Sequence, residues 1–160
     1  MAVKVPVTFA KGTPEDFEEC RKVFENCSLM DHYAKNPEKD VLSVWLYPYL
    51  VSGETILAKN TAGEIVGVMT YLMKGVLGGF PYLGLLGVRQ DYRGQGVGSQ
   101  LIDVFTGICE GVGARKCFIC VSAFNPRAKK LYQSKGFKQV GAIPNMERQG
   151  ITEYLLMKDL

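Results

Sequence analysis

A glycine-rich turn is the stretch whose residue types are best suited to chemistry. It runs from Arg93 to Gly98, after the apolar run Pro81–Val88 and before an amphipathic period that begins at Val97. The first amides of a helix have no backbone partner, and the helix dipole favours negative charge at that end. Glycine lets an anion approach the backbone closely because it has no Cβ. The pattern therefore indicates a phosphate site, with a plain tight strand-to-helix connection as the alternative.

Two other phosphate motifs do not fit this turn. The dinucleotide motif G-x-G-x-x-G needs a third glycine where Ser99 stands, if it is counted from Gly94, or where Leu101 stands, if it is counted from Gly96. The P-loop motif G-x-x-x-x-G-K-[ST] does not occur in the sequence. The pattern that remains is Arg93-x-x-Gly96-x-Gly98.

A second motif begins at Asn125, shortly after a predicted strand. Together, this motif and the glycine turn resemble the motifs of the GCN5-related N-acetyltransferase superfamily. That family's acetyl-CoA loop has the pattern [QR]-x-x-G-x-[GA], which Arg93, Gly96 and Gly98 match. The family's later segment is N-x-x-A-x-x-x-Y-x-x-x-G-F in loose form, and it is matched in order by Asn125, Ala128, Leu131, Tyr132, Gly136 and Phe137. The resemblance spans nearly the whole chain and is strongest over residues 82–137.

The elements that must position these motifs follow the same order as in that family. Alternation predicts a strand at Val3–Ala10, and Thr13-Pro14-Glu15-Asp16 is typical of a helix start. Phe17, Cys20, Phe24 and Cys27 then share one helical face. A short helix is predicted at Val41–Val51, ended or bent by Pro48. Further strands are predicted at Glu54–Lys59, Glu64–Met73, Pro81–Val88, Lys116–Ser122, Phe137–Ala142 and Ile151–Met157, with helices opening at Val97 and Asn125.

The resemblance implies one α/β domain over residues 1–160. Its expected core is a mixed, mostly antiparallel sheet of about seven strands, with a splayed central pair and about four flanking helices.

The resemblance also implies acetyl-CoA as cosubstrate. Backbone amides of the turn would hold its pyrophosphate, and Ser99 would offer a hydroxyl. Pantetheine would pair with the strand at Leu86 and Val88, as an added strand would, and Asn125 would lie near it. Gly84 and Gly87 suit a bulge, a close ligand approach or a plain irregularity of that strand. The expected cofactor-binding residues are Leu86, Val88, Arg93, Gly94, Gln95, Gly96, Val97, Gly98, Ser99 and Asn125.

Tyr132 matches the family's tyrosine that protonates the leaving CoA thiolate, and a core aromatic is the alternative. The implied reaction is direct attack of an amine on the thioester, with the oxyanion held by backbone amides near Leu86 and Val88. An amine of pKa ~10.4 is neutral only about once in 10³ molecules at pH 7, so a base should help.

The sequence departs from the family at the position of that base. Many relatives carry a glutamate on the strand before the glycine loop, but Tyr82–Val88 contains no acid. Others carry one on the following strand, where Cys120 stands here. A covalent acetyl-enzyme on Cys120 is an alternative to direct transfer. The residues left as candidate bases are Asp31, His32, Glu54 and Glu147.

The acceptor is left open between a small-molecule amine and a peptide amine. The resemblance places its contacts in Leu29–Val51, which is rich in aromatics, and in Ile143–Gly150. A non-catalytic acyl-CoA-binding sensor is the second functional hypothesis, because the strand carboxylate is missing. A homodimer is also open.

Composition limits the other partners. The net charge of +3 gives no indication of nucleic-acid binding, and the longest apolar run is 11 residues, about half of what a membrane span needs. The first residues lack the parts of a secretory signal. Five cysteines, an odd number, predict reduced thiols and a cytoplasmic protein. Cys117 and Cys120 form a lone C-x-x-C in a predicted strand, so we expect packing rather than redox chemistry or a metal site.

Overall fold

The computed structural model describes residues 4–34 and 40–160. Val3, at the start of the first expected strand, and residues 35–39 of the expected acceptor segment lie outside the described residues. Seven strands form one sheet in the order β1-β2-β3-β4-β5-β7-β6, which confirms the predicted mixed sheet. Its strands are β1 (Thr8–Lys11), β2 (Thr55–Lys59), β3 (Ile65–Val76), β4 (Phe80–Val88), β5 (Lys116–Ser122), β6 (Lys138–Pro144) and β7 (Thr152–Asp159).

The chain forms two compact units. The first comprises residues 1–71 and 85–101, and the second comprises residues 72–84 and 102–160. Strands β3 and β4 and helix α5 (Val97–Gly111) each contribute to both units.

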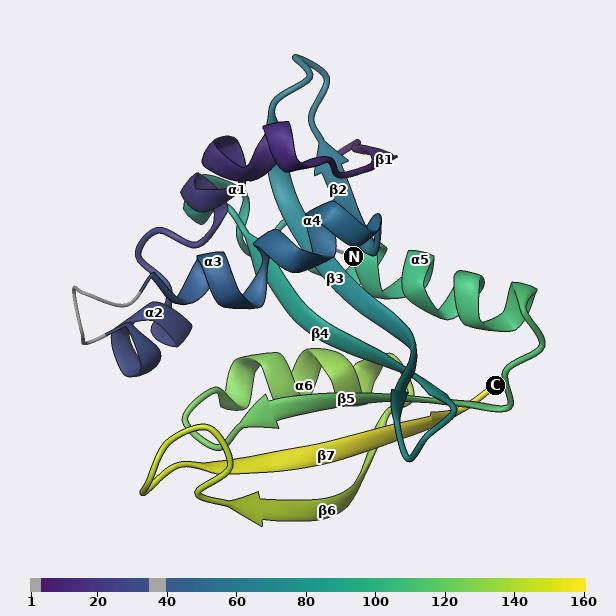
Figure 1. The fold of residues 1–160 in the computed structure, drawn as a ribbon. Coiled ribbons are helices and arrows are strands. Elements are labelled where there is room, and N and C mark those ends of the chain that lie inside the picture. The colour runs from purple at the N-terminus through teal and green to yellow at the C-terminus, as the bar shows by residue number, and fades with distance from the viewer. Residues whose placement is uncertain (1–3, 35–39) are drawn as a thin grey trace. The chain divides into compact units, whose positions relative to one another are not determined.

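In the first unit, β1, β2 and β3 form an antiparallel ladder (Figure 1). The turn between β2 and β3 is closed by Asn60, whose Oδ1 accepts from the amides of Ala62 at 3.0 Å and Glu64 at 2.9 Å. This confirms the hairpin predicted from the sequence, although β3 continues beyond Met73 to Val76.

The first helix begins where its sequence predicts. Thr13 N–H donates to Asp16 Oδ2 at 2.8 Å, a 3-10 turn covers Pro14–Asp16, and α1 follows at Phe17–Val23. The prediction that Cys27 shares its helical face is wrong. The chain leaves the helix after Val23, and Asn26 has a φ of 51°, so that Cys27 instead caps α2 (Ser28–Tyr33).

Pro48 lies where two short helices replace the single one expected at Val41–Val51. They are α3 (Val41–Trp45) and α4 (Tyr47–Ser52), with Pro48 in the first turn of α4, where its missing N–H costs no helical bond. These helices and α1 cover one face of the first unit's sheet, and the buried residues shared between them form its core: Cys20, Val23, Phe24, Leu42, Leu46, Leu50, Leu57, Ile65, Val68 and Leu85.

Helix α5 packs on the opposite face of β3, directly against its backbone at Gly67. A Cβ at this position would lie 2.8 Å from Val97 Cγ1, 2.9 Å from Leu101 Cδ1 and 3.2 Å from Ala58 Cβ. Val97 and Leu101 are fully buried. The glycine therefore sets how closely the first turn of α5 approaches the sheet.

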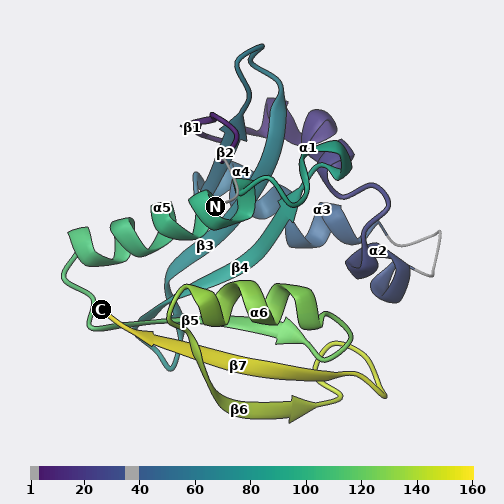
Figure 2. The same cartoon turned by 180° about the vertical axis from the view of Figure 1, so that it is seen from behind.

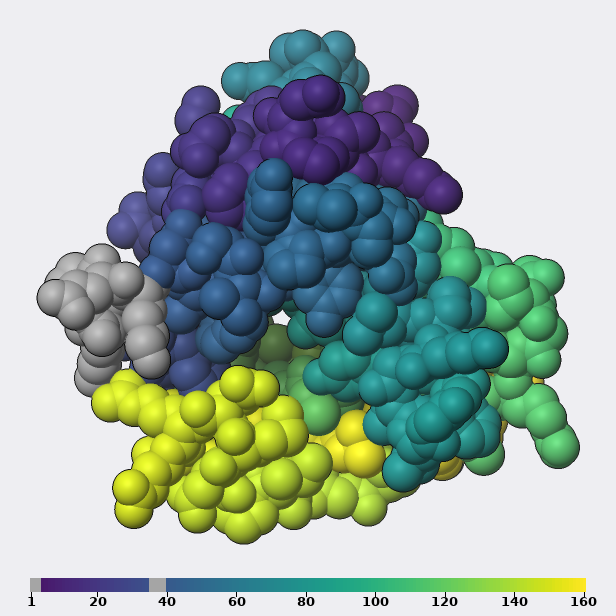
Figure 3. Space-filling view, viewed as in Figure 1, coloured from purple at the N-terminus to yellow at the C-terminus, as the bar shows by residue number. Residues whose placement is uncertain are grey.

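In the second unit, the start of β4 runs parallel to β5, and β5, β7 and β6 are antiparallel neighbours. Helix α6 (Pro126–Ser134) lies along β5, as both ribbon views show (Figures 1 and 2). Strand β6 is exposed along nearly its whole length and, with the loop 145–151, forms part of the visible surface (Figure 3). Six α-helices occur in the described residues, and none of them is long and apolar enough to cross a membrane.

We expect Gly67→Ala to destabilise the fold by about 1–3 kcal/mol, because overpacking a filled core forces its neighbours to move. Urea denaturation followed by circular dichroism would measure the change. Gly79→Ala is the matched control, since a Cβ there meets nothing within 4 Å. Equal stability of the two variants would show that α5 yields easily at this contact.

Candidate functional site

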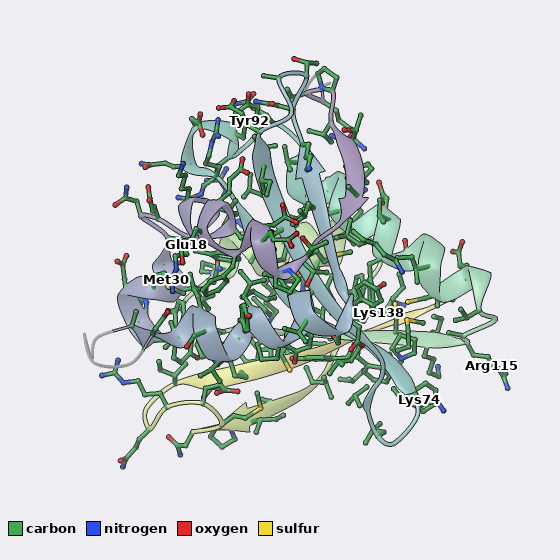
Figure 4. The ribbon with its side chains drawn as sticks, turned by 45° about the horizontal axis from the view of Figure 1, so that its top comes forward. Glu18, Met30, Lys74, Tyr92, Arg115 and Lys138 are labelled. Atoms are coloured by element: carbon green, nitrogen blue, oxygen red, sulfur yellow. The ribbon has the colours of Figure 1, made fainter. Side chains whose placement is uncertain are left out.

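The end of β4 leads into the glycine turn through a short 3-10 helix, Gln90–Tyr92. Arg89 N–H donates to Val66 O at 2.9 Å, which fixes this connection to β3. The Tyr92 hydroxyl accepts from Asn60 Nδ2 at 2.9 Å, so Tyr92 is fixed to the β2–β3 turn (Figure 4). The turn therefore starts from a rigid point of the first unit.

The side chain of Arg93 is engaged with backbone carbonyls. Its Nε donates to Val88 O at 2.9 Å, and its two Nη atoms donate to Asn26 O at 2.8 Å and Glu25 O at 2.9 Å. Its backbone N–H donates to Gln90 O at 3.3 Å. In this structure Arg93 holds the turn to the segment after α1, and the amides that can face a ligand begin at Gly94.

Two glycines of the turn adopt left-handed backbone conformations. The φ angles are 76° at Gly94 and 84° at Gly96, which side chains with a Cβ rarely adopt. Helix α5 then begins at Val97, and Gln100 N–H donates to Gly96 O at 3.1 Å. By helix geometry, the amides that precede Gln100 have no acceptor within the helix. The sequence prediction of a glycine turn opening a helix is confirmed.

Strand β4 carries Leu86 and Val88, both partly exposed. Its register pairs with β5 are Tyr82–Phe118 and Leu83–Ile119, both before Gly84. A Cβ on Gly87 would lie 2.4 Å from Phe24 Cε1, so close packing of that ring against the strand accounts for this glycine.

The second unit brings Asn125 and Tyr132 together on α6. Asn125 Oδ1 accepts from Ala128 N–H at 3.2 Å, which confirms the predicted N-cap, and Pro126 takes the first helical position. Two turns later, Tyr132 is 7% exposed, and its ring meets Phe137 edge-on with centroids 6.5 Å apart. Burial raises the pKa of Tyr132 above its usual value, so the phenol stays protonated at neutral pH.

The aromatic residues expected near an acceptor pack against one another in the first unit. The rings of Tyr33 and Trp45 lie 5.3 Å apart and those of Phe17 and Tyr47 lie 5.2 Å apart, both pairs edge-on. These ring contacts join α2 to α3 and α1 to α4.

The candidate bases named from the sequence lie in different places. His32 Nδ1 is 2.7 Å from Ser28 O within α2, where Asp31 is exposed. Glu54 lies before β2, and burial, together with the charge of Glu54, raises the pKa of Tyr71. Glu147 is exposed in the β6–β7 loop.

Cys120 is partly buried and accepts a hydrogen bond from the hydroxyl of Tyr82. Burial is the larger influence and raises the pKa of the Cys120 thiol. The thiolate is the nucleophilic form of cysteine. A thiol that keeps its proton is poorly suited to form a covalent acetyl-enzyme.

One buried carboxylate was missed from the sequence. Glu153 on β7 is only 5% exposed, and Ser122 Oγ donates to its Oε1 at 2.5 Å. The available signal was an acid inside the otherwise apolar strand predicted at Ile151–Met157, since glutamate is rarely buried without a partner.

The two cysteines of the C-x-x-C motif point to different neighbours, as their strand position predicts. Cys117 is buried and hydrogen-bonds with Cys109 of α5, whereas Cys120 contacts Tyr82. None of the five cysteines, all of which the structure describes, is in a disulfide. Within residues 4–34 and 40–160, no group of three or more His, Cys, Asp or Glu side chains is arranged to hold a metal ion.

The known proteins to which this chain is similar are acetyltransferases. A model described as the acetyltransferase (GNAT) family matches residues 17–137. Acetyltransferase SG1711 of Sodalis glossinidius (strain morsitans) is 26% identical over 129 residues, which cover 81% of this chain and 85% of that protein.

Solved structures show the same fold. A GCN5-related N-acetyltransferase from Kribbella flavida is 22% identical with a TM-score of 0.75, covering 96% of this chain and 98% of that one. A chain of the NatC complex bound to Gag peptide and CoA is 17% identical with a TM-score of 0.73, covering 98% and 99%. Because the family model spans residues 17–137, from the start of α1 to the residue before β6, this chain belongs to the acetyltransferase (GNAT) family.

Proposed function

We propose that the protein is an N-acetyltransferase that moves the acetyl group of acetyl-CoA to an amine. The observation that carries this proposal is the set of amides between the left-handed Gly94 and the first bonded turn of α5. Gly94, Gln95, Gly96, Val97, Gly98 and Ser99 would surround the pyrophosphate with N–H groups and the positive end of a helix. Arg93 then acts through its carbonyl contacts, as the residue that positions the turn.

The pantetheine arm would extend along β4 at Leu86 and Val88, beyond its register pairs with β5. A backbone amide of this segment would hold the oxyanion of the tetrahedral intermediate. Asn125, at the start of α6, would lie near the same arm.

The bound thioester supplies the electrophilic carbonyl, and residues of this chain transfer the protons. As the amine nitrogen bonds to that carbonyl, the carbon–sulfur bond breaks, and Tyr132 donates its phenolic proton to the departing thiolate. The phenolate regains a proton from the nitrogen as the amide forms. The raised pKa of Tyr132 suits this role, because the donor is protonated before each turnover.

The overall test is a screen for release of CoA thiol in the presence of acetyl-CoA and a panel of amines. The panel holds spermidine, kanamycin, a lysine-containing peptide and a peptide with a free N-terminus. Turnover with at least one of them supports the proposal. Calorimetric binding of CoA without any turnover would favour an acyl-CoA sensor instead.

We expect Gly96→Val to weaken CoA binding at least tenfold, about 1.4 kcal/mol. The branched side chain would strain a φ of 84°, and its Cβ would lie 3.0 Å from Lys4 Cγ, so the turn that would hold the phosphate has to shift. Calorimetry with CoA measures the change. Gly63→Val is the matched control, because its φ of 82° imposes the same strain in the β2–β3 turn. Unchanged affinity in folded Gly96→Val protein would contradict the assigned pyrophosphate site.

We expect Tyr132→Phe to lower kcat by about 10²-fold while the affinity for acetyl-CoA stays within twofold. Because burial raises the pKa of Tyr132, its proton is present throughout pH 6–9, so the loss should not depend on pH in this range. Initial rates and calorimetry across that range check both expectations. Tyr154→Phe removes a second phenol of the same unit as a control, and full activity of Tyr132→Phe would exclude Tyr132 as the acid.

A further inference from the structure

The first residues that the structure describes cross the glycine turn. Val5 N–H donates to Gln95 O at 3.0 Å, and Gln100 Nε2 donates to Val5 O at 3.1 Å. The side chain of Lys4 packs on Gly96, where a Cβ would lie 3.0 Å from Lys4 Cγ and 3.6 Å from its Cα. Val5 and Gln100 are 95 positions apart in the sequence, so these contacts are set by the fold and not by a local turn. We call residues 4–5 the N-terminal strap.

Gln100 joins the strap to the start of α5. Its Nε2 lies 3.3 Å from Gly96 O, which also accepts the backbone N–H of Gln100 at 3.1 Å. The side chain is half-buried, and the strap, the turn and Gln100 all belong to the first unit. One glutamine therefore holds a carbonyl of the strap and a carbonyl of the turn at the same time.

The bonds to these carbonyls decide where the amides of the turn point. In a planar trans peptide, the C=O and N–H groups point in opposite directions. Because Val5 holds Gln95 O on one side, the N–H of Gly96 faces the other side. In the same way, Gln100 holds Gly96 O, and the N–H of Val97 points away from it. A left-handed residue followed by a helical one, as at Gly96 and Val97, directs successive amides into one concavity that favours an anion.

We propose that the N-terminal strap and Gln100 position the amides of Gly96 and Val97 for the pyrophosphate of CoA. The inference rests on the proposed acetyltransferase function, which places the diphosphate at this turn. It gives Val5 and Gln100 no contact with the ligand, since both act through the carbonyls that they hold. The first residues of the chain are thereby part of cosubstrate binding.

Preorganisation sets the size of the effect. Amides that already point at the ligand bind it without reorganisation, whereas a turn released from the strap must be reordered when the ligand arrives. Losing one ordinary hydrogen bond changes such an equilibrium about fivefold. Linkage is reciprocal, so CoA must stabilise the strap by the same factor by which the strap favours CoA.

Gln100→Met keeps the length of the side chain and removes its donor. We expect it to weaken CoA binding about fivefold in calorimetry. The KM for acetyl-CoA should rise by the same factor, whereas kcat should stay within twofold, because Gln100 acts on binding and not on the reacting atoms. Gln133→Met, at an exposed position of α6, is the matched control and should bind CoA as the wild type does.

Val5→Pro tests the backbone bond directly, because proline has no N–H to donate. We again expect about fivefold weaker binding of CoA. Val7→Pro changes the next valine of the same segment, leaves the N–H of Val5 in place and should bind CoA like the wild type. Dephospho-CoA keeps the diphosphate and lacks the 3′-phosphate, so Val5→Pro should lose the same factor with it. A loss confined to CoA would place the effect away from the diphosphate and overturn the inference.

The double variant separates a shared strap from two unrelated defects. Changes that act on one element are not additive. We therefore expect Val5→Pro with Gln100→Met to lose no more than about tenfold in CoA affinity, whereas independent defects would multiply to about 25-fold. Amide hydrogen exchange gives the reciprocal readout, because saturating CoA should slow exchange of the Val5 N–H in the wild type.

The outcomes are distinct. A wild type that binds CoA, together with folded Gln100→Met or Val5→Pro protein of equal affinity, overturns the inference and leaves the proposed function standing. An about 25-fold loss in the double variant, or exchange at Val5 that ignores CoA, does the same. A wild type that does not bind CoA overturns the proposed function, and with it the role of the strap.

Discussion

The approach of α5 to β3 at Gly67 is the constraint on which the phosphate turn depends. With no side chain at Gly67, Val97 and Leu101 pack against the strand itself. The start of the helix is therefore fixed at the sheet, and the amides before Gln100 project from a rigid base. A second restraint acts from the N-terminal side, where Val5 N–H donates to Gln95 O at 3.0 Å. A binding site made of backbone amides needs such support, because it has no side chains that can adjust to the ligand.

The local parts of this site were predictable from the sequence. The glycine turn, the Asn125 cap and the β2–β3 hairpin each depend on residues within a few positions of one another, and the structure confirms all three. The role of Arg93 in holding the turn was not predictable from the sequence. Its partners Glu25 and Asn26 lie far away in sequence, and their carbonyls become acceptors only because α1 ends before them. Long-range hydrogen bonds leave no periodic signal.

The roles of individual glycines also could not be predicted from the sequence alone. The sequence alone left Gly87 open between a ligand approach and an irregular strand, and contact with the ring of Phe24 explains it by packing. No pattern in the sequence distinguishes Gly67, although it determines how closely α5 packs on β3. A glycine in a strand signals that something approaches closely, but only the fold shows whether that is a helix, a ring or a ligand.

The position of Glu153 follows from how a sheet presents its residues. Register partners on neighbouring antiparallel strands have Cβ atoms about 5 Å apart, closer than residues two positions apart on one strand. A carboxylate on β7 can therefore reach the same space as one on β5 at the end where Ser122 lies. The sequences of β4 and β5 alone do not reveal this carboxylate, because residues of neighbouring strands share one face of a sheet. The acid expected at Cys120 is absent from β5, and the buried carboxylate of this face comes instead from β7, where Glu153 is the register partner of Ser122.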